Sequence, residues 1–126
     1  MKLNHVGLNV QSEREVVDFY QNILGFHAEY QFELPAEMCD NIFGVNKQLK
    51  VYSYKRDDIF LELFVYPVKP LKGFSHICLE LEDRESIATK CEQSRYQVIR
   101  IKRVDRPDIL FVKDKAGNIF ELKNES

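Results

Sequence analysis

Apolar and polar residues alternate along eight segments of the chain, and this alternation is typical of strands with one buried face. In the first segment, Leu3–Val10, the aliphatic residues Val6, Leu8 and Val10 occupy every second position. We therefore expect these side chains on one face of a strand and His5 on the other. The same pattern predicts further strands over Phe26–Leu34, Leu49–Tyr54, Ile59–Val65, Phe74–Leu81, Gln97–Ile101, Ile109–Val112 and Ile119–Lys123.

Two segments between these strands have helical spacing instead. Ser12 and Glu15 form a capping box, and the apolar residues that follow recur at helical intervals through Leu24. Gly25 stands where a left-handed residue would end that helix. Asp83 is the predicted N-cap of the second helix.

The order of one strand, one helix and three strands occurs twice. Leu3–Val10 resembles Phe74–Leu81, and Ile59–Phe64 resembles Asn118–Leu122. This repeat predicts an α+β fold of two tandem βαβββ modules in one domain, residues 1–126, with repeat 1 at about 1–66 and repeat 2 at about 74–124, joined by a Pro/Lys linker. We place the extra length of the first half in Pro35–Gln48, which fits either a short helix or a loop.

Composition and charge exclude several classes of protein. The net charge of −2 argues against a nucleic-acid binder, which usually has a basic surface. No apolar run approaches the roughly 20 residues that cross a bilayer. The three cysteines form no CxxC pair, and the chain starts without an apolar leader. We therefore expect free thiols and a cytoplasmic protein that binds no membrane.

Each repeat carries a histidine near the start of its first strand and a glutamate within its last strand. These residues are His5 and Glu62 in the first half and His76 and Glu121 in the second. In all four strands they lie opposite the aliphatic face, so we expect them on the face that the helices leave free. Taken singly, each fits an ordinary core or surface residue, but their matching placement favours a shared site for one divalent ion (Zn, Ni, Co, Mn or Fe).

Three further residues share that face by strand parity and are candidates for substrate binding: Asn9, Phe60 and Cys78. For Cys78 the alternative is a small buried apolar residue, and for Phe60 it is ordinary packing.

The chain resembles the vicinal oxygen chelate (VOC) superfamily, which includes glyoxalase I, methylmalonyl-CoA epimerase, extradiol dioxygenases, fosfomycin-resistance thiol transferases and bleomycin-resistance proteins. The resemblance covers essentially the whole chain and is closest to the glyoxalase-like members. It rests on Leu3–Val10, Val17–Tyr20 with Leu24–Phe26, Leu61–Phe64, Phe74–Ile77 and Asp114–Leu122.

This resemblance implies a half-open or closed barrel-like sheet with helices on its outer face, and a homodimer. It places His5, Glu62, His76 and Glu121 at metal-ligand positions, favours Zn or Ni, and assigns proton transfer to Glu121 first and Glu62 second. The implied activity is that of a glyoxalase I-like lyase or isomerase, lactoylglutathione lyase-like or epimerase-like, which takes a small substrate with vicinal oxygens and forms a metal-stabilised enediolate. The alternatives are a small-molecule binding or resistance protein, a dioxygenase and a thiol transferase. Asn9 stands where glutathione-dependent members carry Arg, which argues against a glutathione adduct.

Overall fold

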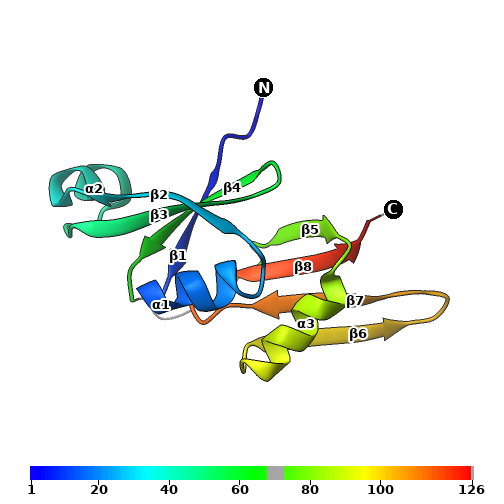
Figure 1. Ribbon diagram of the computed structural model, residues 1–126. Helices are drawn as coiled ribbons and strands as arrows, with labels where there is room; N and C mark the ends of the chain where they lie inside the picture. Colours follow the sequence, from blue (N-terminus) through cyan, green and yellow to red (C-terminus); the bar gives the residue numbers. More distant parts are fainter. Residues whose placement is uncertain (68–72, 126) are drawn as a thin grey trace. The chain divides into compact units, whose positions relative to one another are not determined.

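The protein has two compact units, Met1–Val68 and Lys69–Ser126, and each contains a strand, a helix and three further strands (Figure 1). The computed structural model describes residues 1–67 and 73–125. The division between the units falls in the predicted Pro/Lys linker, of which residues 68–72 lie outside the described residues. The α+β class and the repeated βαβββ module are thereby confirmed.

The first unit is built on a four-stranded sheet with the strand order β1-β4-β3-β2. Strand β1 runs parallel to β4, and β3 runs antiparallel to both β4 and β2. The sheet is open, because β1 and β2 form its two edges. Its strands are β1 (Val6–Val10), β2 (His27–Leu34), β3 (Leu49–Arg56) and β4 (Ile59–Val65).

A single helical segment covers the aliphatic face of this sheet. It starts as α1 (Glu13–Glu15), where the Ser12 hydroxyl accepts a hydrogen bond from the Glu15 backbone amide at 3.4 Å, as the capping box predicts. It continues as a π-helix, η1 (Val16–Gln21), and ends before Gly25, whose φ of 75° is the left-handed conformation expected there. Its aromatic side chains, Phe19 and Tyr20, are fully buried, so this face of the sheet forms the core.

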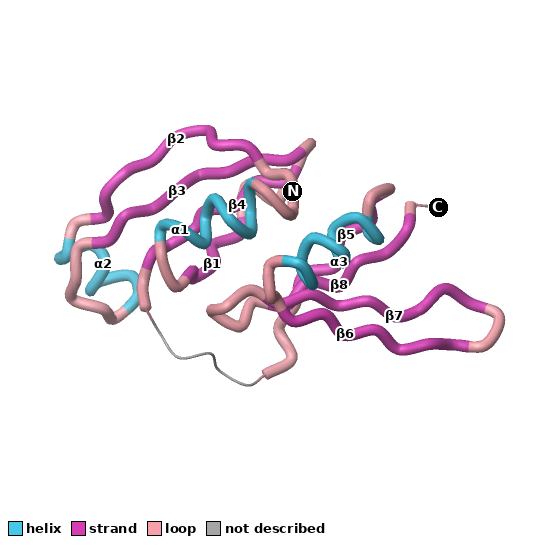
Figure 2. Tube along the Cα trace, turned by 60° about the horizontal axis from the view of Figure 1, so that its bottom comes forward, coloured by secondary structure: helices cyan, strands magenta, loops and turns pink. Residues whose placement is uncertain are grey.

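The segment left open between helix and loop contains a helix, α2 (Ala36–Phe43). Pro35 stands at its N-cap, and Gly44 ends it with a φ of 72°. Cys39 is completely buried and packs in a cluster with Leu34, Leu49 and Val51, against which the Phe64 ring also lies. In Figure 2, α2 lies beside the ends of β2 and β3. The inserted segment therefore covers one end of the sheet face that the main helix leaves free.

The second unit repeats this plan with the strand order β5-β8-β7-β6. Strand β5 runs parallel to β8, and the helix α3 lies against the sheet in both views (Figures 1 and 2). The predicted turn from Asp114 to Asn118 is held by the Asp114 carboxylate, which accepts hydrogen bonds from the Asn118 amide and side chain at 2.8 and 2.7 Å. The elements are β5 (Ile77–Leu81), α3 (Arg84–Gln93), β6 (Gln97–Arg103), β7 (Arg106–Lys113) and β8 (Ile119–Asn124).

Several details differ from the sequence predictions, among them the bounds of β6 and β7, which are longer than predicted. Strands β1 and β5 start later than expected, since their ladders begin with the pairs Val6–Leu61 and Ile77–Phe120. Strand β3 runs on through Arg56, because that residue still pairs with Ile59 across the hairpin. Asp83 precedes α3, but its side chain makes no capping hydrogen bond. In the described part of the chain, no helix has the length and apolar character to cross a membrane.

Candidate metal centre

The parallel pairing of β1 with β4 places the first histidine beside the first glutamate. Gly7 is the register partner of Glu62, and His5 lies two residues earlier on the same face. The Nε2 atom of His5 is 3.3 Å from Oε1 of Glu62. Glu62 is half-buried and its neighbours Leu61 and Leu63 are buried in the core, so the carboxylate has a defined position opposite the helix.

The second unit contains the same arrangement. Cys78 is the register partner of Glu121, and His76 lies two residues before Cys78. The Nε2 atom of His76 is 3.7 Å from Oε1 of Glu121, and the two side chains are exposed to almost the same extent as the first pair. Each repeat thus brings together the histidine and the glutamate that strand parity predicts to share a face.

Both imidazoles are oriented by a hydrogen bond at the other ring nitrogen. Nδ1 of His5 lies 2.8 Å from Oδ1 of Asn4, and Nδ1 of His76 lies 2.8 Å from the carbonyl oxygen of Phe74. Because a carbonyl oxygen only accepts, Nδ1 is the donor in both contacts, and Nε2 is the ring nitrogen on the side of the glutamate. In each half Nε2 faces a carboxylate oxygen, an arrangement that a cation between the two atoms would stabilise.

The donor set and its spacing fit a divalent ion. With metal–ligand bonds of about 2.1 Å, two donors on one ion are about 3.0 Å apart at a right angle and about 3.4 Å apart at the tetrahedral angle. The observed distances of 3.3 and 3.7 Å are close to this range. Within either unit, the described residues form no cluster of three or more His, Cys, Asp or Glu side chains. Each half therefore supplies two donors, and the joining of both pairs on one ion stays a prediction.

A cavity of about 270 Å³ in the first unit lies against its histidine–glutamate pair. The side chain of Ser53, which is almost completely buried, lines it, and the register places Ser53 opposite Glu62 on one side and Tyr30 on the other. The cavity combines aromatic rings, the hydroxyls of Ser53 and Tyr30, and several charged groups. Its lining residues are Lys2, Leu3, Asn4, His5, Glu29, Tyr30, Ser53, Phe60 and Glu62.

The three residues predicted to bind substrate are placed differently from one another. Phe60 lines the cavity, and the Lys55 ammonium lies 5.4 Å from the centre of its ring. Asn9 is exposed on the same face but is not among the described residues that line this cavity. Cys78 is exposed, so the alternative of a buried apolar residue is wrong. Partial burial of its thiol, and next the adjacent Glu121 carboxylate, raise the pKa of Cys78.

Sequence reasoning missed Ser53 and Tyr30. Both lie on the free face, since Ser53 pairs with Glu62 and Tyr30 pairs with Ser53. The available signal was Ser53 itself, a small polar residue between the two tyrosines Tyr52 and Tyr54 in a strand rich in large residues.

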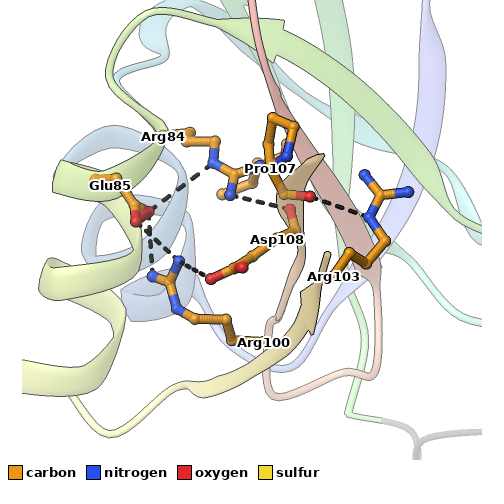
Figure 3. A network of polar contacts seen from close by, with 7 residues as sticks. Arg84, Glu85, Arg100, Arg103, Pro107 and Asp108 are labelled. Atoms are coloured by element: carbon orange, nitrogen blue, oxygen red, sulfur yellow. Dashed lines mark hydrogen bonds and ion pairs between the residues drawn. The ribbon is translucent and has the colours of Figure 1, made fainter. Parts of the chain in front are cut away.

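Three arginines of the second half make local contacts. Arg100 donates two hydrogen bonds to the Glu85 carboxylate, at 2.8 and 3.1 Å, and Arg103 donates one to the Pro107 carbonyl (Figure 3). Buried Arg84 donates to the backbone carbonyls of Leu122 and Asp108, both at 3.0 Å. These contacts hold the three arginines against neighbouring elements of the second unit.

Comparison with known proteins places these features in a family. A family model described as the Glyoxalase/Bleomycin resistance protein/Dioxygenase superfamily matches residues 2–122. No curated protein sequence matches the chain significantly.

Solved structures share the fold at low sequence identity. A glyoxalase family protein from Enterococcus faecalis is 19% identical, with 96% of this chain and 95% of that chain covered and a TM-score of 0.69. A mutant of the fosfomycin resistance protein FosX from Listeria monocytogenes, solved with Mn(II) and 1S,2S-dihydroxypropylphosphonic acid, is 16% identical, with 99% and 93% covered and a TM-score of 0.74. A glyoxalase family protein from Bacillus cereus is 13% identical, with 99% and 94% covered and a TM-score of 0.74.

Proposed function

Because the chain belongs to the Glyoxalase/Bleomycin resistance protein/Dioxygenase superfamily, we propose that it is a divalent-metal-dependent lyase or isomerase of the glyoxalase type. Its substrate is a small molecule with two adjacent oxygens, and its reaction moves a proton on the carbon next to a carbonyl. We further propose that it acts as a cytoplasmic homodimer.

One observation carries this proposal: each half presents an imidazole nitrogen and a carboxylate oxygen to each other across parallel strands. The distances are 3.3 Å for His5 and Glu62 and 3.7 Å for His76 and Glu121. A set of two imidazoles and two carboxylates without a thiolate suits a catalytic rather than a structural ion. We propose that the four side chains hold one ion, with Zn or Ni favoured.

A bound divalent ion would act there as a Lewis acid that polarises the substrate carbonyl. The protein's own residues orient the donors, since the Asn4 side chain and the Phe74 carbonyl fix the two imidazole rings. A strand glutamate takes the proton from carbon and returns it, as general base and then general acid. Glu121 is the first candidate for this role and Glu62 the second.

The test combines metal analysis with proton exchange. The full chain, loaded with Ni²⁺ or Zn²⁺, is incubated in D₂O with methylglyoxal–thiol adducts and with α-carbonyl epimers, and deuterium incorporation is followed by NMR. We expect one metal per chain and metal-dependent incorporation, which Glu121→Gln lowers more strongly than Glu62→Gln. Absence of turnover with the metal bound would refute the enzymatic proposal.

A metal-free protein that does not respond to added metal would instead favour the small-molecule binding alternative. In that case the same substrates would show no deuterium incorporation under any metal condition. Elemental analysis of the purified full chain therefore separates the enzyme from the binding protein before any substrate is tried.

A further inference from the structure

Equivalent rows of side chains cross the free faces of the two sheets, and they differ in size. In each row the glutamate of the proposed ion site is the second member, and the register defines its neighbours on both sides. The rows are Gly7–Glu62–Ser53–Tyr30 in the first unit and Cys78–Glu121–Phe111–Ile99 in the second.

The first row leaves space beside its glutamate, and the second row fills it. Ser53 has a small side chain, and the cavity of about 270 Å³ lies against Ser53 and Glu62, whereas the ring of Phe64 takes the space beside Gly7. In the second unit Phe111 occupies the position of Ser53, and its ring packs edge-on against the ring of His76 with the centres 6.0 Å apart. The repeat has therefore become asymmetric in side-chain volume while the His–Glu pairs stay alike.

The chemistry of the cavity indicates what it binds. The rings of Tyr30 and Phe60 line it, and the Ser53 hydroxyl offers one donor and two acceptor sites. Flat aromatic groups pack well against such rings. A cavity of about 150 Å³ already holds a benzene ring, so the space here admits an aryl group together with the atoms that join it to the ion.

We propose that Tyr30, Phe60 and Ser53 determine substrate specificity, and that the first half binds an aryl group attached to the pair of adjacent oxygens. This inference rests on the proposed function, because the oxygens are taken to bind the ion held by the two His–Glu pairs. The second half then contributes ligands, with the Phe111 ring in the place of Ser53.

Two hydroxamates test the proposed ion site and the proposed aryl pocket separately. Both present adjacent oxygens to a metal, but benzohydroxamate carries a phenyl ring and acetohydroxamate a methyl group. Affinities are measured by isothermal titration calorimetry on the full chain loaded with Ni²⁺. We expect benzohydroxamate to bind about tenfold more tightly than acetohydroxamate, since its ring is buried in the cavity.

Three variants test the named residues through the ratio of the two affinities. Phe60→Ala and Tyr30→Ala should lower the preference to about threefold or less. Ser53→Phe, which gives the first row the residue of the second, should abolish the preference and leave acetohydroxamate binding within about twofold of the parent. Ile99→Ala is the matched control, because Ile99 holds the position of Tyr30 in the other half. In Ile99→Ala, the ratio of the benzohydroxamate affinity to the acetohydroxamate affinity should stay at about ten.

The outcomes are distinct. If the loaded protein binds neither hydroxamate, the proposed function is refuted and the inference with it. If both bind equally, or the preference survives Phe60→Ala and Tyr30→Ala, the ion site stands and the aryl pocket is overturned. Tyr30 is 58% exposed, so its truncation leaves the fold intact and keeps the test decisive even if the Ser53 variant does not fold.

Discussion

Replacement of Arg84 by methionine should destabilise the second unit strongly. The Arg84 residue is only 5% exposed, and its guanidinium donates to the carbonyls of Leu122 in β8 and Asp108 in β7, both at 3.0 Å. The ladder between these two strands covers only Phe111–Lys113 with Ile119–Glu121. The arginine therefore bridges β7 and β8 beyond the end of their ladder. Figure 3 shows Arg84 beside Asp108.

The magnitude follows from the two hydrogen bonds. Each bond to a charged donor contributes about 1.5–3 kcal/mol, and its loss leaves a carbonyl without that partner. Methionine recovers part of this through apolar burial and removes the cost of a buried charge. We expect Arg84→Met to lower the free energy of unfolding by about 2–4 kcal/mol.

Urea denaturation of the full chain measures this loss as a shift of the midpoint by about 1–2 M at unchanged slope. The matched control is Arg100→Met, which removes a neighbouring arginine whose side chain is 32% exposed and whose partner Glu85 lies mostly in solvent. That variant should lose less than about 1 kcal/mol, because exposed ion pairs contribute little. Equal losses in the two variants would refute the reasoning from burial.

Three further predictions concern charge, backbone and metal. The hydrogen bond from Arg100 holds the pKa of Glu85 below its usual 4.5. The stabilisation by this pair is therefore present above pH 4.5 and disappears as the pH falls through the lower pKa of the folded state. Urea midpoints of the parent and of Arg100→Met, measured at a series of acidic pH values, should converge over that range. Gly25→Ala should cost about 1–2 kcal/mol in urea titrations, since its φ is 75°. Added Ni²⁺ should raise the thermal midpoint of the parent in calorimetry, and His5→Ala or His76→Ala should remove most of that increase.

Strand parity was sufficient to predict which candidate residues share a face within each half. The aliphatic alternation around His5 and Glu62 placed both side chains on the face opposite the helix, and the structure brings them to 3.3 Å. The capping box at Ser12 and the left-handed Gly25 were equally local features. Such predictions succeed because two or three neighbouring residues decide them.

The hydrogen bonds within the first helix and the register between strands could not be predicted from the sequence. The π-helical turn η1 keeps nearly the same apolar spacing as an α-helix, so its hydrogen bonds from Leu24 to Phe19 left no trace in the pattern. Ser53 lies beside Glu62 only because of the register between β3 and β4. Parity gives the face of a residue but not its neighbour across the sheet.

The joining of the two histidine–glutamate pairs on one ion is a prediction that neither local sequence nor strand register within a unit decides. Parity predicts that both pairs face away from the helices, and each unit bears this out for its own pair. Their meeting on one ion depends on the placement of one half relative to the other, which the alternation of residues within a strand does not encode. It is the part of the candidate site that metal analysis and the His→Ala variants are designed to test.

The parallel neighbours in each sheet are its first and last strands along the chain, β1 with β4 and β5 with β8. An ion held by His5 and Glu62 would therefore tie together the two ends of an entire module, and the same holds for His76 and Glu121. No partly formed hairpin contains both members of a pair, so tight capture of the cation must wait until the intervening chain has folded. Cation uptake would thus report that folding of each module is complete.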